Sequence, residues 1–214
     1  MREAADAESV DTALILAGGS STRFRAPKAL VDVAGKPMVQ RVFEAVSPFA
    51  GEVIVSIADS SMADALRRFL SRAEYAVDER RGMGPIEGIR RGIEIARGER
   101  LLVAPCDAPL LRPGLYRLLL EVLGAYDAAV PKFEVLDPVR AVYRRNHVAE
   151  ILQADRTVPS PSALADRLNY VPVGPDRIRR VDPDLSSFVD VNSRVDLDEV
   201  LRRVRASEAP RDTH

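Results

Sequence analysis

The stretch 16–28 combines residue types that suit the binding of a phosphate chain. Two glycines follow an apolar run, three hydroxyl side chains come next, and Arg23 and Lys28 add positive charge on the same loop: Gly18, Gly19, Ser20, Ser21, Thr22, Arg23 and Lys28. Glycines allow a tight turn whose bare backbone N–H groups face an anion. The pattern favours a nucleoside triphosphate as ligand, although an ordinary strand-to-helix turn with two solvated cations would have the same composition.

Asp107 is a candidate ligand for a divalent cation. It follows the apolar run 100–105 through Cys106, so it stands at the carboxyl end of an expected buried strand. Ligands of open α/β sheets bind beyond these strand ends, and Mg²⁺ prefers carboxylate oxygens. A helix N-cap for 112–123, or a turn, would account for this aspartate equally well. Cys106 itself has the character of a small buried hydrophobe.

Two further positions carry polar side chains that could contact a ligand. Asp78 precedes the glycine-rich loop 82–84, and its carboxylate could accept hydrogen bonds from both N1–H and the exocyclic amine of guanine. An ordinary solvated turn is the alternative. The segment 186–191 is expected as a short strand, whose alternation places Asp190 and Asn192 on one face. A helix N-cap near Asn192 explains that pair equally well.

Short apolar runs alternate with helical patterns along the first two thirds of the chain. Strands are expected at 12–17, 52–58, 74–77, 100–105 and 126–131, with helices at 38–49, 60–72, 85–96 and 113–123. This alternation predicts an α/β fold with a doubly wound, mostly parallel sheet and helices on both faces. The polar loops after three of these strands would then meet at one edge of the sheet.

The pattern becomes less regular from about residue 137. Strands are expected at 139–145 and 169–173, and helices at 146–155, 160–168 and 195–205. We interpret 12–205 as a single domain, with a nucleotide-binding part at 12–135 and an acceptor-side part at 136–205. Residues 1–11 and 206–214 are expected to be flexible tails.

Composition excludes several classes of function. The 214 residues carry 31 basic and 32 acidic side chains, so the balanced charge argues against a nucleic-acid partner. One cysteine and two histidines exclude a disulfide framework and a metal centre rich in these residues. The acidic amino terminus is not a signal peptide and no run is long enough to span a membrane, so a cytoplasmic location is expected. Lysine occurs only at Lys28, Lys36 and Lys132.

The motifs together resemble a known family. LAGG-x-S-x-R followed by PKAL-x-x-V-x-GKPM resembles the signature of GT-A-like nucleotidyltransferases. Further segments resemble, in order, those of the molybdenum cofactor guanylyltransferases (molybdopterin-guanine dinucleotide biosynthesis protein A): GMGPIEGIRRGI (82–93), APCDAPLL (104–111), LDPVRAVY (136–143) and SSFVDVNSRVDLDEV (186–200). The matches extend from about residue 12 to residue 201.

The resemblance implies transfer of GMP from GTP to the phosphate of molybdopterin or Mo-molybdopterin, with release of pyrophosphate and Mg²⁺ as cofactor. It implies nucleotide contacts from Leu16, Ala17, Gly18, Gly19, Ser20, Lys28, Asp78 and Asp107. It implies catalytic roles for Arg23, Lys28 and Asp107, metal ligation by Asp107 and Asp190, and an acceptor or metal contact from Asn192. The partners expected are these two small substrates, with transient contact to proteins that load molybdoenzymes, and neither nucleic acid nor membrane.

Several positions depart from the family pattern. Arg25 and Pro27 replace a usual glycine and aspartate, Asp190 replaces an asparagine, and Ala58 stands near the place of an asparagine that contacts the base. These departures bear on which base the nucleotide substrate carries more than on the nucleotidyl-transfer reaction itself. The alternatives are a cytidylyltransferase for the same cofactor, a guanylyltransferase for cobinamide phosphate, a sugar-phosphate enzyme, or a non-catalytic nucleotide-binding domain. Candidate acceptor contacts of low weight are Tyr143, Arg144, Arg145 and His147.

Overall fold

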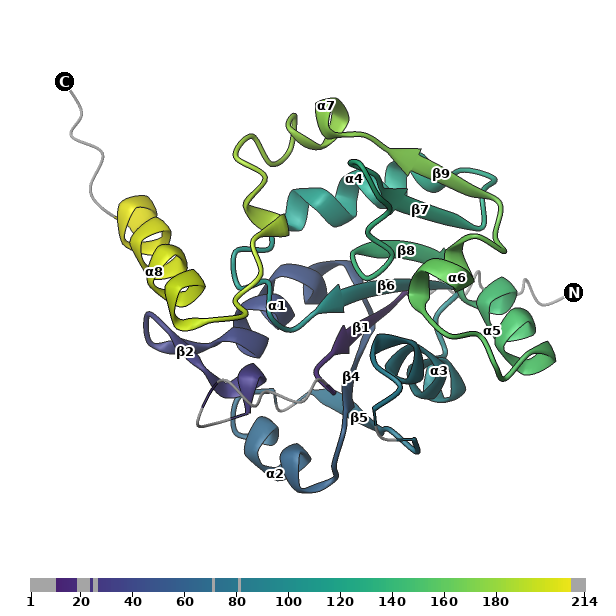
Figure 1. The fold of residues 1–214 in the computed structure, drawn as a ribbon, viewed down its shortest axis with the longest axis horizontal. Coiled ribbons are helices and arrows are strands. Elements are labelled where there is room, and N and C mark those ends of the chain that lie inside the picture. Colours follow the sequence, from purple (N-terminus) through teal and green to yellow (C-terminus); the bar gives the residue numbers. More distant parts are fainter. Residues whose placement is uncertain (1–10, 19–23, 25–26, 71, 81, 209–214) are drawn as a thin grey trace, which may run out of the picture.

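A seven-stranded sheet forms the centre of the protein (Figure 1). The computed structural model describes residues 11–18, 24, 27–70, 72–80 and 82–208. The strands of the sheet are β1 (Thr12–Leu16), β4 (Glu52–Ile57), β5 (Ala73–Val77), β6 (Arg100–Pro105), β7 (Ala128–Pro131), β8 (Ala141–Arg144) and β9 (Tyr170–Val173). Their order across the sheet is β5-β4-β1-β6-β8-β7-β9.

The sheet is mostly parallel, as the alternating pattern predicted. β5, β4, β1 and β6 pair in parallel, β8 runs antiparallel to both β6 and β7, and β9 returns parallel to β7. From β1 the chain proceeds to β4 on one side and later returns to β6 on the other. The gap beyond the carboxyl ends of β1 and β6 is therefore a topological switch point, where such sheets bind ligands.

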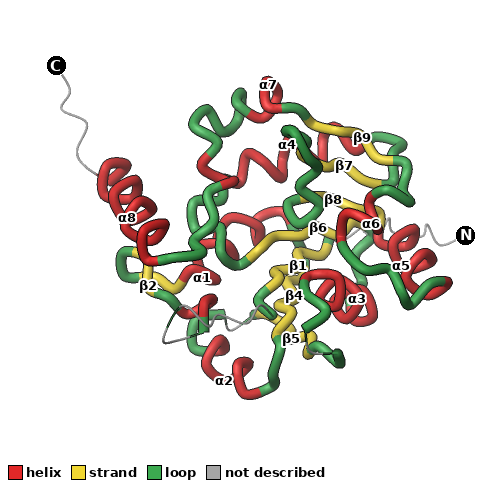
Figure 2. Tube along the Cα trace, in the orientation of Figure 1, coloured by secondary structure: helices red, strands yellow, loops and turns green. Residues whose placement is uncertain are grey.

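Helices cover both faces of the sheet (Figure 2). The helices are α1 (Met38–Val46), α2 (Ser61–Arg67), α3 (Pro85–Ile95), α4 (Pro113–Leu123), α5 (Arg145–Ala154), α6 (Pro161–Ala165), α7 (Pro175–Ile178) and α8 (Arg194–Glu208). One apolar core lies between the sheet and α1, α2 and α4, and a second lies between the sheet and α3, α5 and α6. The prediction of helices on both faces is thus confirmed.

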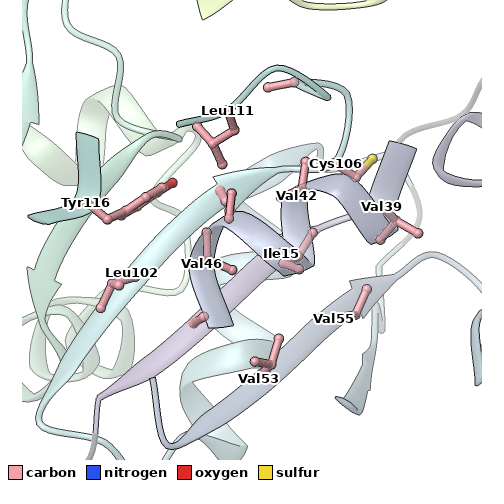
Figure 3. Packing of buried hydrophobic residues seen from close by; sticks show 14 of the residues in the cluster. Ile15, Val39, Val42, Val46, Val53, Val55, Leu102, Cys106, Leu111 and Tyr116 are labelled. Atoms are coloured by element: carbon pink, nitrogen blue, oxygen red, sulfur yellow. The ribbon is translucent and has the colours of Figure 1, made fainter. Parts of the chain in front are cut away.

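Apolar strands explain why both faces are covered. All five residues of β1 are buried, because a strand in the middle of a parallel sheet has helices above and below it. Figure 3 shows Ile15 of β1 among Val39, Val42 and Val46 of α1. Leu14 belongs instead to the opposite core, as the alternation of side chains along a strand requires.

A small third layer lies beside the sheet. The hairpin of β2 (Asp32–Val33) and β3 (Lys36–Pro37) packs with α8 in a separate apolar cluster that includes Met38 and Val191. In Figure 1 this helix lies at the left, beside β2. The hairpin, α7 and the 3-10 helices η1 (Lys28–Leu30), η2 (Ser47–Phe49) and η3 (Ser186–Phe188) were not predicted.

The expected strand at 186–191 was wrong. Residues Ser186–Phe188 form η3, and no strand follows before α8. The local cause is Asp182, a fully buried carboxylate that accepts hydrogen bonds from the backbone N–H groups of Ser186 and Ser187 at 3.1 and 2.9 Å. These bonds curl the chain where alternation suggested an extended segment.

The sheet crosses the boundary between the two parts expected within the domain, because β8 and β9 pair with strands that precede residue 135. Within the part of the chain that the structure describes, helices are all too short or too polar to cross a membrane.

Candidate active site

A cleft of about 280 Å³ opens at the switch point. It is lined by Leu16, Gly18, Lys28, Ser56, Asp78, Gly84, Pro85, Gly88, Pro105, Cys106, Asp107, Val139, Arg140 and Asp190. The ends of β1 and β6 are held side by side because the N–H of Cys106 donates to the carbonyl of Leu16 at 3.1 Å. The first turn of α3 closes one side, and residues 139–140 close the other.

Lys28 is the central cation of the described part of the cleft. Its Nζ donates to Asp107 Oδ2 at 2.5 Å and to Asn192 Oδ1 at 2.7 Å. Lys28 and Asp107 are largely shielded, with 17% and 22% of their side chains exposed. The N–H of Val191 donates to the carbonyl of Asp107 at 2.9 Å, which fixes the segment carrying Asn192 against the end of β6.

Arg140 organises the opposite wall. Only 4% of its side chain is exposed, and its Nε donates to the carbonyl of Ser187 at 2.8 Å. Its two terminal nitrogens pair with Asp137, at 2.7 Å, and with Asp190. Burial alone would lower the pKa of Arg140, but the two carboxylates raise it above its usual range. Burial raises the pKa of Asp190, although Arg140 opposes that effect.

The cleft offers Mg²⁺ a small set of protein ligands. Asp107 and Asp190 both line it, and they are close enough for Asp107 to contribute to the raised pKa of Asp190. Among the described residues, no three His, Cys, Asp or Glu side chains are grouped to hold an ion. Mg²⁺ in nucleotide enzymes commonly takes one or two carboxylates and completes its shell with phosphate oxygens and water. The donor set fits that mode.

Asp78 lies at the far end of the cleft, beyond the end of β5. Its Oδ1 accepts a hydrogen bond from Ser56 Oγ at 3.1 Å. A Cβ on Gly18 would lie 2.5 Å from Asp78 Oδ2, so a larger residue there would displace this carboxylate from its present position. Burial raises the pKa of Asp78, Glu87 adds to that effect, and the hydrogen bond from Ser56 partly offsets it.

The glycine-rich segment after Asp78 is tied to α3. Gly84 adopts φ +71° as the residue before the helix, and Pro85 begins the helix. Glu87, with 1% of its side chain exposed, accepts hydrogen bonds from the backbone N–H of Arg80 at 3.3 Å and from its guanidinium at 2.9 Å. Glu87 therefore anchors the loop that carries Asp78.

Most of the expected site residues that the structure describes meet in this cleft. Those that line it are Leu16, Gly18, Lys28, Asp78, Asp107 and Asp190. Asn192 joins through Lys28, whereas Ala17 is 4% exposed and only donates its N–H to the carbonyl of Ser56. Gly19, Ser20 and Arg23 lie outside the described residues, as does Arg25. Their expected roles therefore stay predictions.

The structure also decides the capping alternatives. Asp107 does not cap the helix at 113–123, because the residue before α4 is Arg112. Ser193 does cap α8: its Oγ accepts from the N–H of Asp196 at 3.3 Å, and Asp196 accepts from the N–H of Ser193 at 2.7 Å. The side chain of Asn192 is thereby left to bind Lys28.

The residues considered as acceptor contacts at 143–147 do not line the cleft. Tyr143 and Arg144 pair with Leu101 and Arg100, at the start of β6, so they lie at the opposite edge of the sheet from the cleft. Tyr143 is fully buried and donates to the carbonyl of Pro138, and His147 pairs with Asp127. Ser56 and Arg140 also line the cleft and were not predicted as site residues. An arginine inside the apolar run VRAVY was the available signal for the second.

The comparisons with known proteins agree with this geometry. Residues 13–169 match the model of the MobA-like NTP transferase domain. A probable molybdenum cofactor guanylyltransferase of Methanosarcina mazei is 31% identical over 202 residues, 89% of each chain. The molybdenum cofactor guanylyltransferase of Desulfosudis oleivorans is 29% identical, over 91% of this chain and 96% of the relative.

A solved structure has the same fold. The molybdopterin-guanine dinucleotide biosynthesis protein A of Archaeoglobus fulgidus superposes with a TM-score of 0.77 at 26% identity, covering 91% of this chain and 99% of that one. These similarities establish that the chain belongs to the family of MobA-like NTP transferase domains.

Proposed function

We propose that the protein transfers GMP from GTP to the phosphate of molybdopterin or Mo-molybdopterin and releases pyrophosphate. The observation that carries this proposal is the meeting of Lys28 with Asp107 at the switch point of a MobA-like domain. A binding module has no need of a cation and a carboxylate paired where a phosphate chain is expected. The names of the relatives supply the guanylyl group and the acceptor.

The chemistry requires positioning more than proton transfer. The attacking phosphate of the acceptor is already ionised, so in-line displacement at the α-phosphorus needs no strong general base. The backbone of the first loop, including Gly18, would bind the phosphates. Lys28 would neutralise the charge that moves onto the leaving pyrophosphate, together with Arg23. Asp107, assisted by Asp190, would hold Mg²⁺, which supplies electrostatic activation of the phosphorus.

Asp78 is the residue on which the choice of guanine depends. Its carboxylate would accept hydrogen bonds from N1–H and the exocyclic amine of guanine, and it is partly buried at the end of the cleft. Cytosine and adenine cannot offer that pair of donors, so a wrong base would leave the carboxylate without the two hydrogen bonds that guanine supplies. We therefore expect GTP to exceed CTP and ATP by at least about tenfold in kcat/KM, since 1.4 kcal/mol corresponds to a factor of ten.

The test is a comparison of triphosphates with purified protein, molybdopterin and Mg²⁺. Pyrophosphate release is followed and the dinucleotide product is identified by mass. Formation of the guanine dinucleotide with GTP preferred supports the proposal. A preference for CTP would indicate the cytidylyltransferase alternative, and binding of GTP without product would indicate a non-catalytic domain. We place this reaction in the cytoplasm, with transient contact to proteins that load molybdoenzymes.

A further inference from the structure

A second cavity, of about 430 Å³, adjoins the cleft. It is lined by Phe133, Val135, Leu136, Asp137, Val139, Arg140, Leu185, Phe188 and Asp190. Three of these residues, Val139, Arg140 and Asp190, also line the cleft, so the two cavities share a wall. We name this second cavity the side groove.

The side groove has an aromatic floor. The rings of Phe133 and Phe188 meet edge to face, with centroids 4.8 Å apart and an angle of 74° between the planes. Both side chains are only partly buried, and Val135 at the rim has 75% of its surface exposed. The Cζ of Arg140 lies 5.5 Å from the centroid of the Phe188 ring, which fixes the ring at the shared wall. Apolar and aromatic side chains in this arrangement suit a flat heterocycle.

The only carboxylate that lines the side groove without lining the cleft is Asp137. One of its oxygens is held by Arg140 at 2.7 Å, and the described residues offer no hydrogen bond to the other. Its side chain is 19% exposed, so the free oxygen can still reach a ligand. A carboxylate beside an aromatic floor suits a ring that presents N–H donors along one edge.

We propose that the side groove binds the pterin ring of the acceptor. This inference rests on the proposed function, and it adds a location and a recognition mode for the acceptor. The pyrimidinone ring of a pterin is flat and carries an N–H next to an exocyclic amine, so it supplies the donors that Asp137 can accept. Because the two cavities share a wall, an acceptor whose ring lies in the side groove can extend its phosphate toward Lys28 and Asp107. Phe133 and Asp137 would be the binding residues specific to this ring.

The direct test uses unsubstituted pterin as the probe, followed by its own fluorescence with the full-length protein. GTP and Mg²⁺ are present at saturation, because the donor edge of pterin resembles that of guanine and pterin could otherwise enter the cleft. We expect pterin to bind alongside GTP, and Phe133→Ala and Asp137→Asn each to weaken its binding about tenfold, the scale of one lost stacking or hydrogen-bonding contact. Binding that GTP abolishes would place pterin in the cleft and overturn the proposal.

Steady-state kinetics give a second readout that a merely structural role would not move. Phe133→Ala and Asp137→Asn should raise the KM for molybdopterin while the KM for GTP stays unchanged. Phe69→Ala and Asp64→Asn, at exposed positions outside the cavity, are the matched controls. Phe133→Leu keeps an apolar side chain and should still lose pterin binding, so a folding defect of the alanine variant does not decide the outcome.

The outcomes separate the two proposals. One outcome is that the wild-type protein transfers GMP to molybdopterin while Phe133→Ala and Asp137→Asn both show the wild-type KM for that acceptor. In that case the side groove is not the acceptor site. If the wild-type protein binds pterin in the groove but transfers no nucleotide to molybdopterin, the proposed function fails while the binding site stands.

Discussion

The two walls of the cleft are built in different ways. The nucleotide wall, formed by the ends of β1, β4, β5 and β6, rests on the parallel ladder of the sheet and its buried apolar strands. The acceptor wall, formed by residues 133–140 and 185–192, contains no strand and is held by Arg140 and its three oxygen partners. Backbone pairing spreads its energy over many bonds, whereas in the acceptor wall the side chain of Arg140 joins the two segments through its bonds to Ser187 and Asp190.

This difference makes the acceptor wall the more sensitive of the two. A single substitution in the nucleotide wall removes one contact from a rigid frame. Loss of Arg140 would leave two carboxylates and a carbonyl without their donor, in a place that water reaches only partly. Four substitutions test that contrast.

Arg140→Met should destabilise the protein by about 3 kcal/mol, the lower end of the cost of removing one partner from a buried ion pair. The lower end applies because Asp137 and Asp190 are partly exposed. Chemical denaturation measures the change, with Arg67→Met as the control, since that arginine is 61% exposed and its ion pair should contribute less than about 1 kcal/mol. Adding Asp190→Asn should restore part of the lost free energy of unfolding, because it removes one of the charges that Arg140→Met leaves without a partner. Equal effects for the two arginines would refute the contrast.

Asp107→Asn should keep the fold and lower kcat at least about a hundredfold, the scale of one lost electrostatic contact in a transition state. The amide can still accept a hydrogen bond from Lys28 but is a poor ligand for Mg²⁺. Turnover at saturating Mg²⁺ and the melting temperature are the two measurements, with Asp64→Asn as the control. A folded variant with wild-type turnover would remove Asp107 from the mechanism.

Lys28→Arg should lower kcat about tenfold although the charge is kept. The ammonium lies between Asp107 and Asn192 at 2.5 and 2.7 Å, and a planar guanidinium cannot reproduce that geometry. Lys36 belongs to the neighbouring hairpin and pairs with Glu44 at the surface. Lys36→Arg is therefore the matched control and should leave kcat unchanged. Normal turnover of Lys28→Arg would identify Lys28 as a generic cation.

Asp78→Asn should lower the preference for GTP and slightly raise the melting temperature at pH 7. The pKa of Asp78 is raised above its ordinary value of 3.8 by burial, so folding favours the protonated carboxyl. That stabilising contribution is complete below the ordinary value and is lost as the pH rises through the folded-state pKa. The melting temperature of Asp78→Asn should therefore exceed that of the wild type by more at pH 7 than at pH 4. A larger difference at pH 4 would contradict the assigned cause.

The sequence predicted the nucleotide wall far better than the acceptor wall. Apolar runs and strand-end polar residues placed Asp78 and Asp107 at one edge, because parallel strands repeat a simple pattern. The segment 186–191 failed because its conformation depends on Asp182, whose buried carboxylate curls the backbone. Arg140 stands out locally as an arginine within an apolar run, but its partners Asp190 and Ser187 lie about fifty residues away, so the local pattern could not show what it contacts.

The contacts of Lys28 also impose an order on folding. They join residues 79 and 164 positions apart, and contacts between such distant positions close late because long loops lose more entropy. During synthesis the amino-terminal strands leave the ribosome first and can begin to pair. Asn192 leaves the ribosome only after the seven strands of the sheet. In a nascent chain that stops before that residue, the sheet could be assembled while Lys28 in η1 still lacks one of its two anchors.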